Sequence, residues 1–318
     1  MEMSYGKTEE AFFRLLRMGL RRADADFPVR LAAEEWERVW KMAREQALTG
    51  VVFDGVCQLP EEGRPPKGLV FRWLSAVQGI EQANRKLNRY AVKVSARFRR
   101  EGFRSAILKG QGNALWYPNP LHRTPGDIDI WLEGGRERIM AYVRRYVPNA
   151  GARYHHVDFP VLKDVEVEVH FTPSWLSAWG DNRRLQRWFA EKADGQFAHE
   201  VELPEGAGSV SVPTEEVNRI FLLLHIYRHF FDEGIGLRQL ADYLLLLERG
   251  CTGEERRRAA ELLERFRLGR FASAVMYILQ RIFGMEEKFL LVPPSAKEGE
   301  FVLREIMRTG NFGQYNAG

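Results

Sequence analysis

The clearest chemical signal in the chain is a pair of aspartates two residues apart, Asp127 and Asp129, in the segment Gly-Asp-Ile-Asp-Ile. Successive side chains of a β-strand point to opposite faces, so the two carboxylates would share one face and the isoleucines the other. The alternating segment 165–170 places Glu168 on a further strand. Three neighbouring carboxylates repel one another unless a cation joins them, and Mg²⁺ prefers such oxygen ligands. The pattern predicts a metal site of Asp127, Asp129 and Glu168 suited to phosphoryl or nucleotidyl transfer. Glu166 would share a face with Glu168 and is the alternative third ligand.

The elements around these residues predict one α+β unit over residues 101–175, between helical regions at 1–100 and 176–318. The predicted order is a strand (104–108), helical turns (111–117), the aspartate strand, a helix (136–146) and two strands (154–159 and 165–171). In this arrangement His155 and His156 are interpreted as ordinary strand positions.

Composition limits the classes of protein that fit. The 318 residues include 47 Lys and Arg against 43 Asp and Glu, a net charge of +4 that permits anionic ligands such as nucleotides or RNA. Cys57 and Cys251 lie far apart and form neither a metal-binding spacing nor a disulfide framework, which predicts a cytoplasmic location. The apolar runs are too short to cross a bilayer, so no membrane association is expected.

Two further patterns invite other functions. His225 and His229 share a helix face, but no glutamate follows His225, so a zinc hydrolase is not favoured. Basic residues spaced by four along a predicted helix form a stripe that would fit either an RNA backbone or solvent. The stripe consists of Arg85, Arg89, Lys93 and Arg97.

Several short motifs together resemble one superfamily. They are Leu108-Lys109-Gly110, Tyr117-Pro118, Arg123, Gly126-Asp127-Ile128-Asp129 and Glu168-Val169-His170. On these residues the chain resembles the nucleotidyltransferase superfamily that includes DNA polymerase β. More narrowly, it is similar to the bacterial family of uncharacterised nucleotidyltransferases. The resemblance implies an α+β fold in which a small mixed sheet with packed helices is flanked by N- and C-terminal helical regions.

The resemblance also implies roles for residues. Asp127, Asp129 and Glu168 would hold two Mg²⁺ ions, and an NTP such as ATP would donate its NMP to a small molecule, RNA or protein that the sequence does not identify. The expected nucleotide-binding residues are Lys109, Gly110, Arg123 and His170. The C-terminal helices would line the cleft with His225, Arg238 and Asp242.

Two alternatives remain open. The superfamily usually has Ser or Gly after the glycine that corresponds to Gly110, whereas this chain has Gln111. That departure favours a catalytically inactive, nucleotide-binding regulatory module. The basic stripe favours a protein that binds RNA or another protein through its helical flanks.

Overall fold

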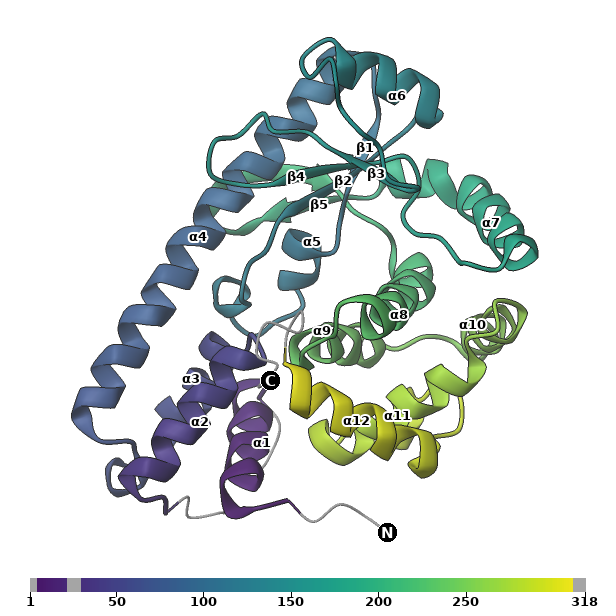
Figure 1. Cartoon of the computed structure of the whole chain (residues 1–318). Coiled ribbons are helices and arrows are strands. Elements are labelled where there is room, and N and C mark those ends of the chain that lie inside the picture. Colours follow the sequence, from purple (N-terminus) through teal and green to yellow (C-terminus); the bar gives the residue numbers. More distant parts are fainter. Residues whose placement is uncertain (1–4, 22–29, 311–318) are drawn as a thin grey trace.

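Helices make up most of the molecule, and one small sheet lies among them (Figure 1). The computed structural model of the chain describes residues 5–21 and 30–310. The fold is α+β with a mixed sheet and helical regions on both sides, which confirms the predicted fold class. Within the described residues, no helix is both long enough and apolar enough to span a membrane.

The sheet has four strands in the order β1, β2, β4, β3. Their bounds are β1 (Ser105–Leu108), β2 (Ile128–Leu132), β3 (His156–Asp158) and β4 (Val167–His170). Strands β2 and β4 are parallel, and the other two pairs are antiparallel. The short helix α5 (Gly110–Ala114) follows β1, and α6 (Gly135–Arg144) follows β2. The strand order therefore brings the aspartate strand next to the glutamate strand.

The two faces of the sheet have different characters. On β2, Ile128 and Ile130 are fully buried in a hydrophobic core that also contains residues of α6. Asp129 lies between these isoleucines, so its side chain leaves the opposite face, as the alternation of the strand predicts. Trp131, on the same face as Asp129, packs against Phe197 with 4.7 Å between ring centroids.

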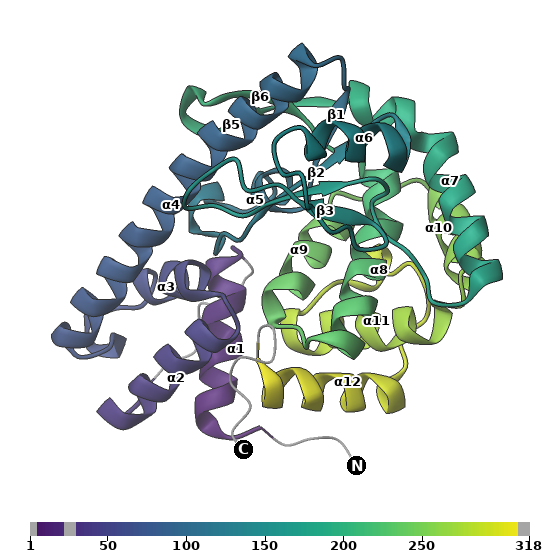
Figure 2. The ribbon, with the colours of Figure 1, turned by 45° about the horizontal axis from the view of Figure 1, so that its top comes forward.

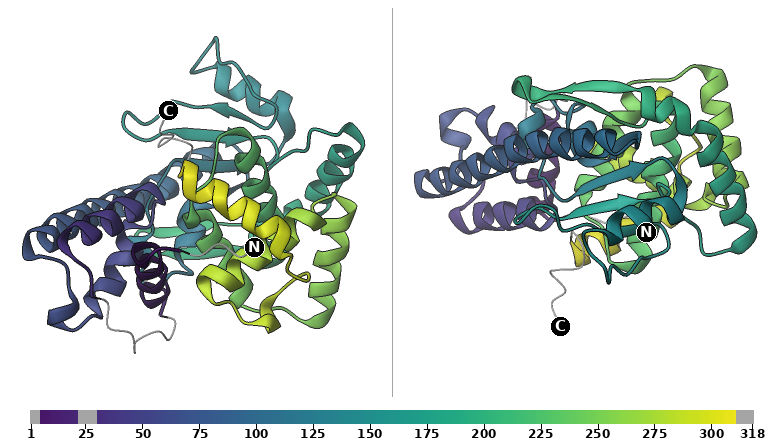
Figure 3. Two further views of the ribbon diagram at one scale, coloured as in Figure 1. Left: turned by 60° about the horizontal axis from the view of Figure 1, so that its bottom comes forward. Right: turned by 90° about the horizontal axis from the view of Figure 1, so that it is seen from above.

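Helix α4 (Lys67–Arg100) is 34 residues long and belongs to two hydrophobic cores. Its first half contributes Leu69, Trp73 and Val77 to the core of the N-terminal helices. Its second half contributes Leu87, Ala91, Val94 and Phe98 to the core of the sheet. Seen from above, α4 runs alongside the sheet (Figure 3).

The N-terminal helices pack at the free end of α4. They are α1 (Lys7–Gly19), α2 (Ala33–Glu45) and α3 (Thr49–Cys57). Helices α1 and α3 approach so closely that a Cβ atom on Gly19 would lie 1.8 Å from the carbonyl oxygen of Val51. His122 connects α3 to α4 through its two ring nitrogens. They lie 2.8 Å from Asp54 Oδ1 on α3 and 3.0 Å from Glu81 Oε1 on α4.

The C-terminal region consists of helices and one hairpin. The helices are α7 (Trp179–Ala198), α8 (Glu215–Asp232), α9 (Leu237–Glu248), α10 (Gly253–Arg265), α11 (Gly269–Phe283) and α12 (Ala296–Thr309). The hairpin, β5 (Glu200–Leu203) and β6 (Gly208–Ser211), was not predicted, and it packs in the same core as the second half of α4. Helices α8 and α9 lie beneath the sheet (Figure 1 and Figure 2).

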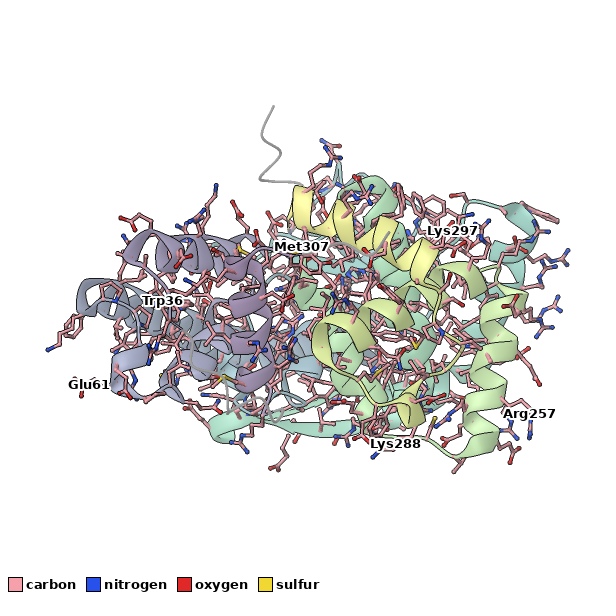
Figure 4. All side chains as sticks on the ribbon, turned by 90° about the horizontal axis from the view of Figure 1, so that it is seen from below. Trp36, Glu61, Arg257, Lys288, Lys297 and Met307 are labelled. Carbon is pink, nitrogen blue, oxygen red and sulfur yellow. The ribbon has the colours of Figure 1, made fainter. Side chains whose placement is uncertain are left out.

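Helix α12 closes the side of the molecule opposite the sheet. Its Met307 end lies toward the N-terminal helices, where Trp36 is found, and its Lys297 end points away from them (Figure 4). The Gln46 side chain donates a hydrogen bond to the carbonyl of Ile306 at 3.3 Å. The first and last parts of the described chain are therefore packed together.

Candidate active site

A cavity of about 350 Å³ lies between the polar face of the sheet and helices α8 and α9. Its lining includes every residue that the sequence placed in the site. They are Lys109, Gly110, Arg123, Asp127, Asp129, Glu168, His170, His225, Arg238 and Asp242. The structure thus brings residues from the sheet and from the C-terminal helices to one cleft.

Asp129 is at the centre of the charged groups in this cleft and is 3% exposed. Its Oδ2 lies 3.0 Å from Lys109 Nζ, and its Oδ1 lies 2.9 Å from His170 Nε2. Burial alone would raise the pKa of this carboxyl, but Lys109 and His170 hold the pKa well below its usual range. Asp129 is therefore a carboxylate with both oxygens engaged by protein groups.

Glu168 stands beside Asp129 because the parallel register of β2 and β4 pairs these two residues directly. Its Oε2 lies 3.4 Å from His170 Nε2. Burial opposes ionisation of Glu168, but His170 lowers its pKa. Glu166, the alternative third ligand, is exposed just before this strand.

Asp127 immediately precedes β2 and lines the same cavity. The negative charge of Asp129, together with burial, raises the pKa of Asp127 to about 6. The chemistry of these donors suits a divalent cation, because Asp129 and Glu168 supply oxygen ligands from adjacent strands and Asp127 a further one from the residue before β2. Ligand atoms of Asp129, Glu168 and His170 lie within 4.8 Å of one another. The residues therefore fit the Mg²⁺ that the family resemblance implies.

Lys109 changes one expectation drawn from the sequence. The three carboxylates were expected to be uncompensated in the absence of a metal, and this is wrong, because Lys109 and His170 already neutralise Asp129. Lys109 follows β1 with φ at +54°, a conformation that L-residues with a side chain rarely adopt. Gly110 follows with φ at +37° and begins α5. This turn directs the Lys109 side chain into the cleft.

His155 and His156 are site residues that the sequence reasoning missed. Both line the cavity, and His156 Nδ1 lies 3.1 Å from His155 Nε2 and 3.4 Å from Glu168 Oε2. Side chains of consecutive strand residues would point to opposite faces, but His155 lies in a bend just before β3. The two adjacent histidines, followed by a strand, were the available signal.

A buried network joins the core to α9. Arg123 donates from Nε to Asp242 Oδ1 at 2.9 Å and from Nη2 to Asp242 Oδ2 at 2.8 Å. Tyr117 donates its hydroxyl to Asp242 Oδ1 at 2.7 Å, and Asn113 donates its amide to Oδ2 at 3.2 Å. The prediction that Arg123 binds a nucleotide remains a prediction, and the structure gives its guanidinium a protein partner.

A family model described as "Uncharacterised nucleotidyltransferase" matches residues 32–284. The chain belongs to this family. Among solved structures it is similar to an antigenic nucleotidyltransferase-like protein from Paracoccidioides brasiliensis, with 12% sequence identity and a TM-score of 0.40 over 66% of this chain and 95% of that chain. No curated protein matches the chain. The resemblance inferred from the motifs between Leu108 and His170 is confirmed at the level of the family.

The C-terminal wall of the cavity carries several nitrogen groups. His225 and His229 on α8 have pKa values below the usual range, because burial and the nearby Lys109 disfavour their charged forms. Arg228, between them, places Nη1 3.4 Å from His155 Nε2. Arg238 on α9 donates to the carbonyl of Thr124 at 2.9 Å, and burial lowers its pKa to about 10.

The basic stripe on α4 lies outside the lining of this cavity. Arg85 is bonded to Glu81 and Glu205, at 3.0 and 2.8 Å, and Arg97 donates to the hydroxyl of Tyr142 at 3.0 Å. Half of the stripe therefore has intramolecular partners, which favours a structural role for those residues.

Proposed function

We propose that this protein is a Mg²⁺-dependent nucleotidyltransferase that moves an NMP from an NTP, such as ATP, to an acceptor hydroxyl. The observation that carries the proposal is the direct pairing of Asp129 with Glu168 on adjacent parallel strands, with Asp127 at the start of β2 in the same cleft. Three carboxylates from two neighbouring strands form a site for divalent cations that bind a triphosphate.

Asp127, Asp129 and Glu168 would hold two Mg²⁺ ions. When bound, such ions offset the charge of the triphosphate and lower the pKa of the attacking hydroxyl. The acceptor oxygen forms a bond to the α-phosphorus, the bond from that phosphorus to the bridging oxygen breaks, and pyrophosphate leaves.

The protein's own residues supply the remaining functions. Glu168, which His170 keeps ionised, accepts the proton of the attacking hydroxyl. Lys109 holds Asp129 in place and offsets negative charge on the nucleotide. Arg153 and Arg228 line the cavity and would contact the phosphates, since guanidinium groups bind phosphate through paired N–H donors.

The acceptor is a small molecule, an RNA or a protein, and we propose that the reaction takes place in the cytoplasm. Both cysteines, Cys57 and Cys251, are free thiols, as expected in a reducing compartment.

A second candidate is a nucleotide-binding regulatory module without turnover. The observation that favours it is the engagement of both Asp129 oxygens, one by Lys109 and one by His170. Such a module would bind NTP without releasing pyrophosphate.

The test is incubation of the full chain with each labelled NTP and Mg²⁺, followed by measurement of pyrophosphate and of label on protein, RNA and small molecules. Glu168→Gln should abolish release of pyrophosphate. Glu166→Gln, two residues earlier on the same segment and exposed, is the matched control and should keep it. NTP binding without pyrophosphate under every condition would support the regulatory module. Equal rates in the two variants would refute the assignment of Glu168.

A further inference from the structure

Three histidines gather at one side of the cleft. His155, His156 and His170 are 8%, 3% and 3% exposed, so each side chain is more than nine-tenths buried. One ring nitrogen from each lies within 4.8 Å of the others. The proposed transfer reaction uses His170 to position carboxylates and gives no role to the other two. This cluster therefore needs its own explanation.

The backbone brings these rings together. Strands β3 and β4 are antiparallel, and their register pairs His156 directly with His170 and Asp158 with Glu168. Paired residues on neighbouring strands project from the same face. The bend at residue 155 turns His155 toward the same point, and Phe171 donates its amide to the His155 carbonyl at 2.8 Å. The cluster rests on paired strands rather than on a loop.

The nitrogen and oxygen atoms that face one another have the spacing of metal ligands. His155 Nε2 and His156 Nδ1 are 3.1 Å apart, and Glu168 Oε2 lies 3.4 Å from His156 Nδ1. Glu168 Oε2 also lies 3.4 Å from His170 Nε2. Ligands of tetrahedral Zn²⁺ at bond lengths of about 2.0–2.1 Å are separated by roughly 3.3–3.5 Å. These three separations are close to that value, and one ring nitrogen from each of the three histidines lies within 4.8 Å of the others.

The opposite ring nitrogens make no hydrogen bond to the described part of the protein. His155 Nδ1, His156 Nε2 and His170 Nδ1 are buried and have no hydrogen-bond partner among the described residues. The hydrogen-bonding contacts of all three rings are therefore concentrated on the nitrogens that face the cluster. Two imidazole nitrogens 3.1 Å apart can share a single proton, whereas a metal ion accepts a lone pair from each.

We propose that His155, His156, His170 and Glu168 form a binding site for one transition-metal ion of the Zn²⁺ class. Imidazole nitrogen suits zinc and its neighbours in the first transition row, whereas Mg²⁺ prefers oxygen alone. The site therefore selects an ion different from the one held by the three carboxylates. Arg228 places Nη1 3.4 Å from His155 Nε2, so the proposal requires this guanidinium to move away from His155 when the ion binds.

The histidine site is separable from the proposed transfer reaction. It shares Glu168 with the carboxylate site, but His155 and His156 belong only to the first and Asp127 only to the second. Variants of His155 or His156 therefore test only the Zn²⁺ site, and a variant of Asp127 tests only the Mg²⁺ site.

The experiment uses the full chain after treatment with a chelator. Zn²⁺ binding is measured by calorimetry, and Co²⁺ is added as a spectroscopic probe because four-coordinate Co²⁺ has intense visible absorption. We expect one ion per chain and a four-coordinate Co²⁺ spectrum. His155→Gln and His156→Gln should each weaken Zn²⁺ binding at least about 100-fold, since even outer ligand partners contribute 10–100-fold.

Two controls come from the same cleft. His225→Gln removes a histidine that lies outside the cluster, and Asp127→Asn removes a carboxylate that belongs only to the Mg²⁺ site. Both should bind Zn²⁺ as the parent does, while Asp127→Asn should lose thermal stabilisation by Mg²⁺ and NTP. Thermal melting of each metal-free variant shows whether it is folded.

Several outcomes would overturn the proposal. They are an octahedral Co²⁺ spectrum, Zn²⁺ affinity unchanged in both cluster variants, or equal loss of affinity in His225→Gln. If the cluster variants do not fold, X-ray absorption of the Zn²⁺-loaded parent decides the question, since fewer than three nitrogen ligands would contradict the site.

Discussion

The buried ion pair Arg123–Asp242 joins α9 to the core, and its contribution to stability can be measured by substitution. Arg123 and Asp242 are 5% and 4% exposed, and they are joined by two hydrogen bonds of 2.9 and 2.8 Å. The change Asp242→Asn removes the negative charge at nearly constant shape. It leaves the Arg123 guanidinium buried without a counter-ion, close to the second cation, Arg238.

The expected cost follows from that burial. Removing one partner of a buried ion pair lowers the free energy of unfolding by about 3–5 kcal/mol. The hydrogen bond from Tyr117 adds no further cost, because the side-chain oxygen of the new asparagine still accepts it. The double variant Arg123→Met, Asp242→Leu removes both charges and should recover part of the loss, since apolar replacement of a buried pair is often close to neutral. The recovery is incomplete because the change also removes the acceptor of Tyr117 and Asn113.

The assay is unfolding by guanidinium chloride, monitored by tryptophan fluorescence. The free energies of unfolding are compared with the same m-value for all variants. A cost below about 1 kcal/mol for Asp242→Asn would refute the interpretation of this pair as an attachment of α9 to the core. The double variant also tests Arg123 as a phosphate ligand: unchanged NTP affinity would assign it a positioning role.

Three further outcomes are expected. Asp129→Asn should lower the free energy of unfolding of the metal-free protein by about 1–3 kcal/mol, because the neutral asparagine has one acceptor oxygen for the two buried donors Lys109 and His170, and equal or higher stability in chemical unfolding would contradict this. Arg228→Met should weaken NTP binding by about 1.5–3 kcal/mol if the guanidinium contacts phosphate, and calorimetry showing parental affinity would exclude that contact. His122 has a raised pKa, since its two carboxylate partners outweigh the effect of burial. The parent should therefore be more stable than His122→Asn by the largest amount below the unfolded pKa of about 6.5. This difference in the free energy of unfolding should shrink as the pH rises through the higher folded pKa, and unfolding at a series of pH values measures it.

The alternation of Asp127 to Ile130 was sufficient to predict the faces of β2, because one face of that strand is apolar and the other is not. The helix predicted over residues 136–146 matches α6 (Gly135–Arg144) to within two residues at each end. It was harder to predict which side chains form ion pairs in the site. The ion pair of Lys109 with Asp129 depends on a positive φ in the turn after β1, and local sequence does not reveal that conformation for a lysine.

The missed elements have physical explanations. The segment Glu200 to Leu203 alternates charged and apolar residues, but it is only four residues long and follows directly on the 20-residue helix α7. Its stability comes from packing against α4, about a hundred residues earlier in the chain, which no local pattern indicates. The same applies to His155, whose direction is set by a bend and by its bond to Phe171 on the neighbouring strand.

The division of α4 between two cores has a consequence for the order in which the protein is made. The first half of the helix packs on α2 and α3, which leave the ribosome before it. The second half exposes Leu87, Ala91, Val94 and Phe98, whose partners include Val210 and Val212 on the hairpin side of the core. Residues of the sheet and α6 in the same core emerge next, so the cover of this apolar face is completed only when residue 212 has emerged. Until then the growing chain exposes apolar residues of the second half of α4 to solvent. During this stage of synthesis we expect aggregation and the binding of chaperones.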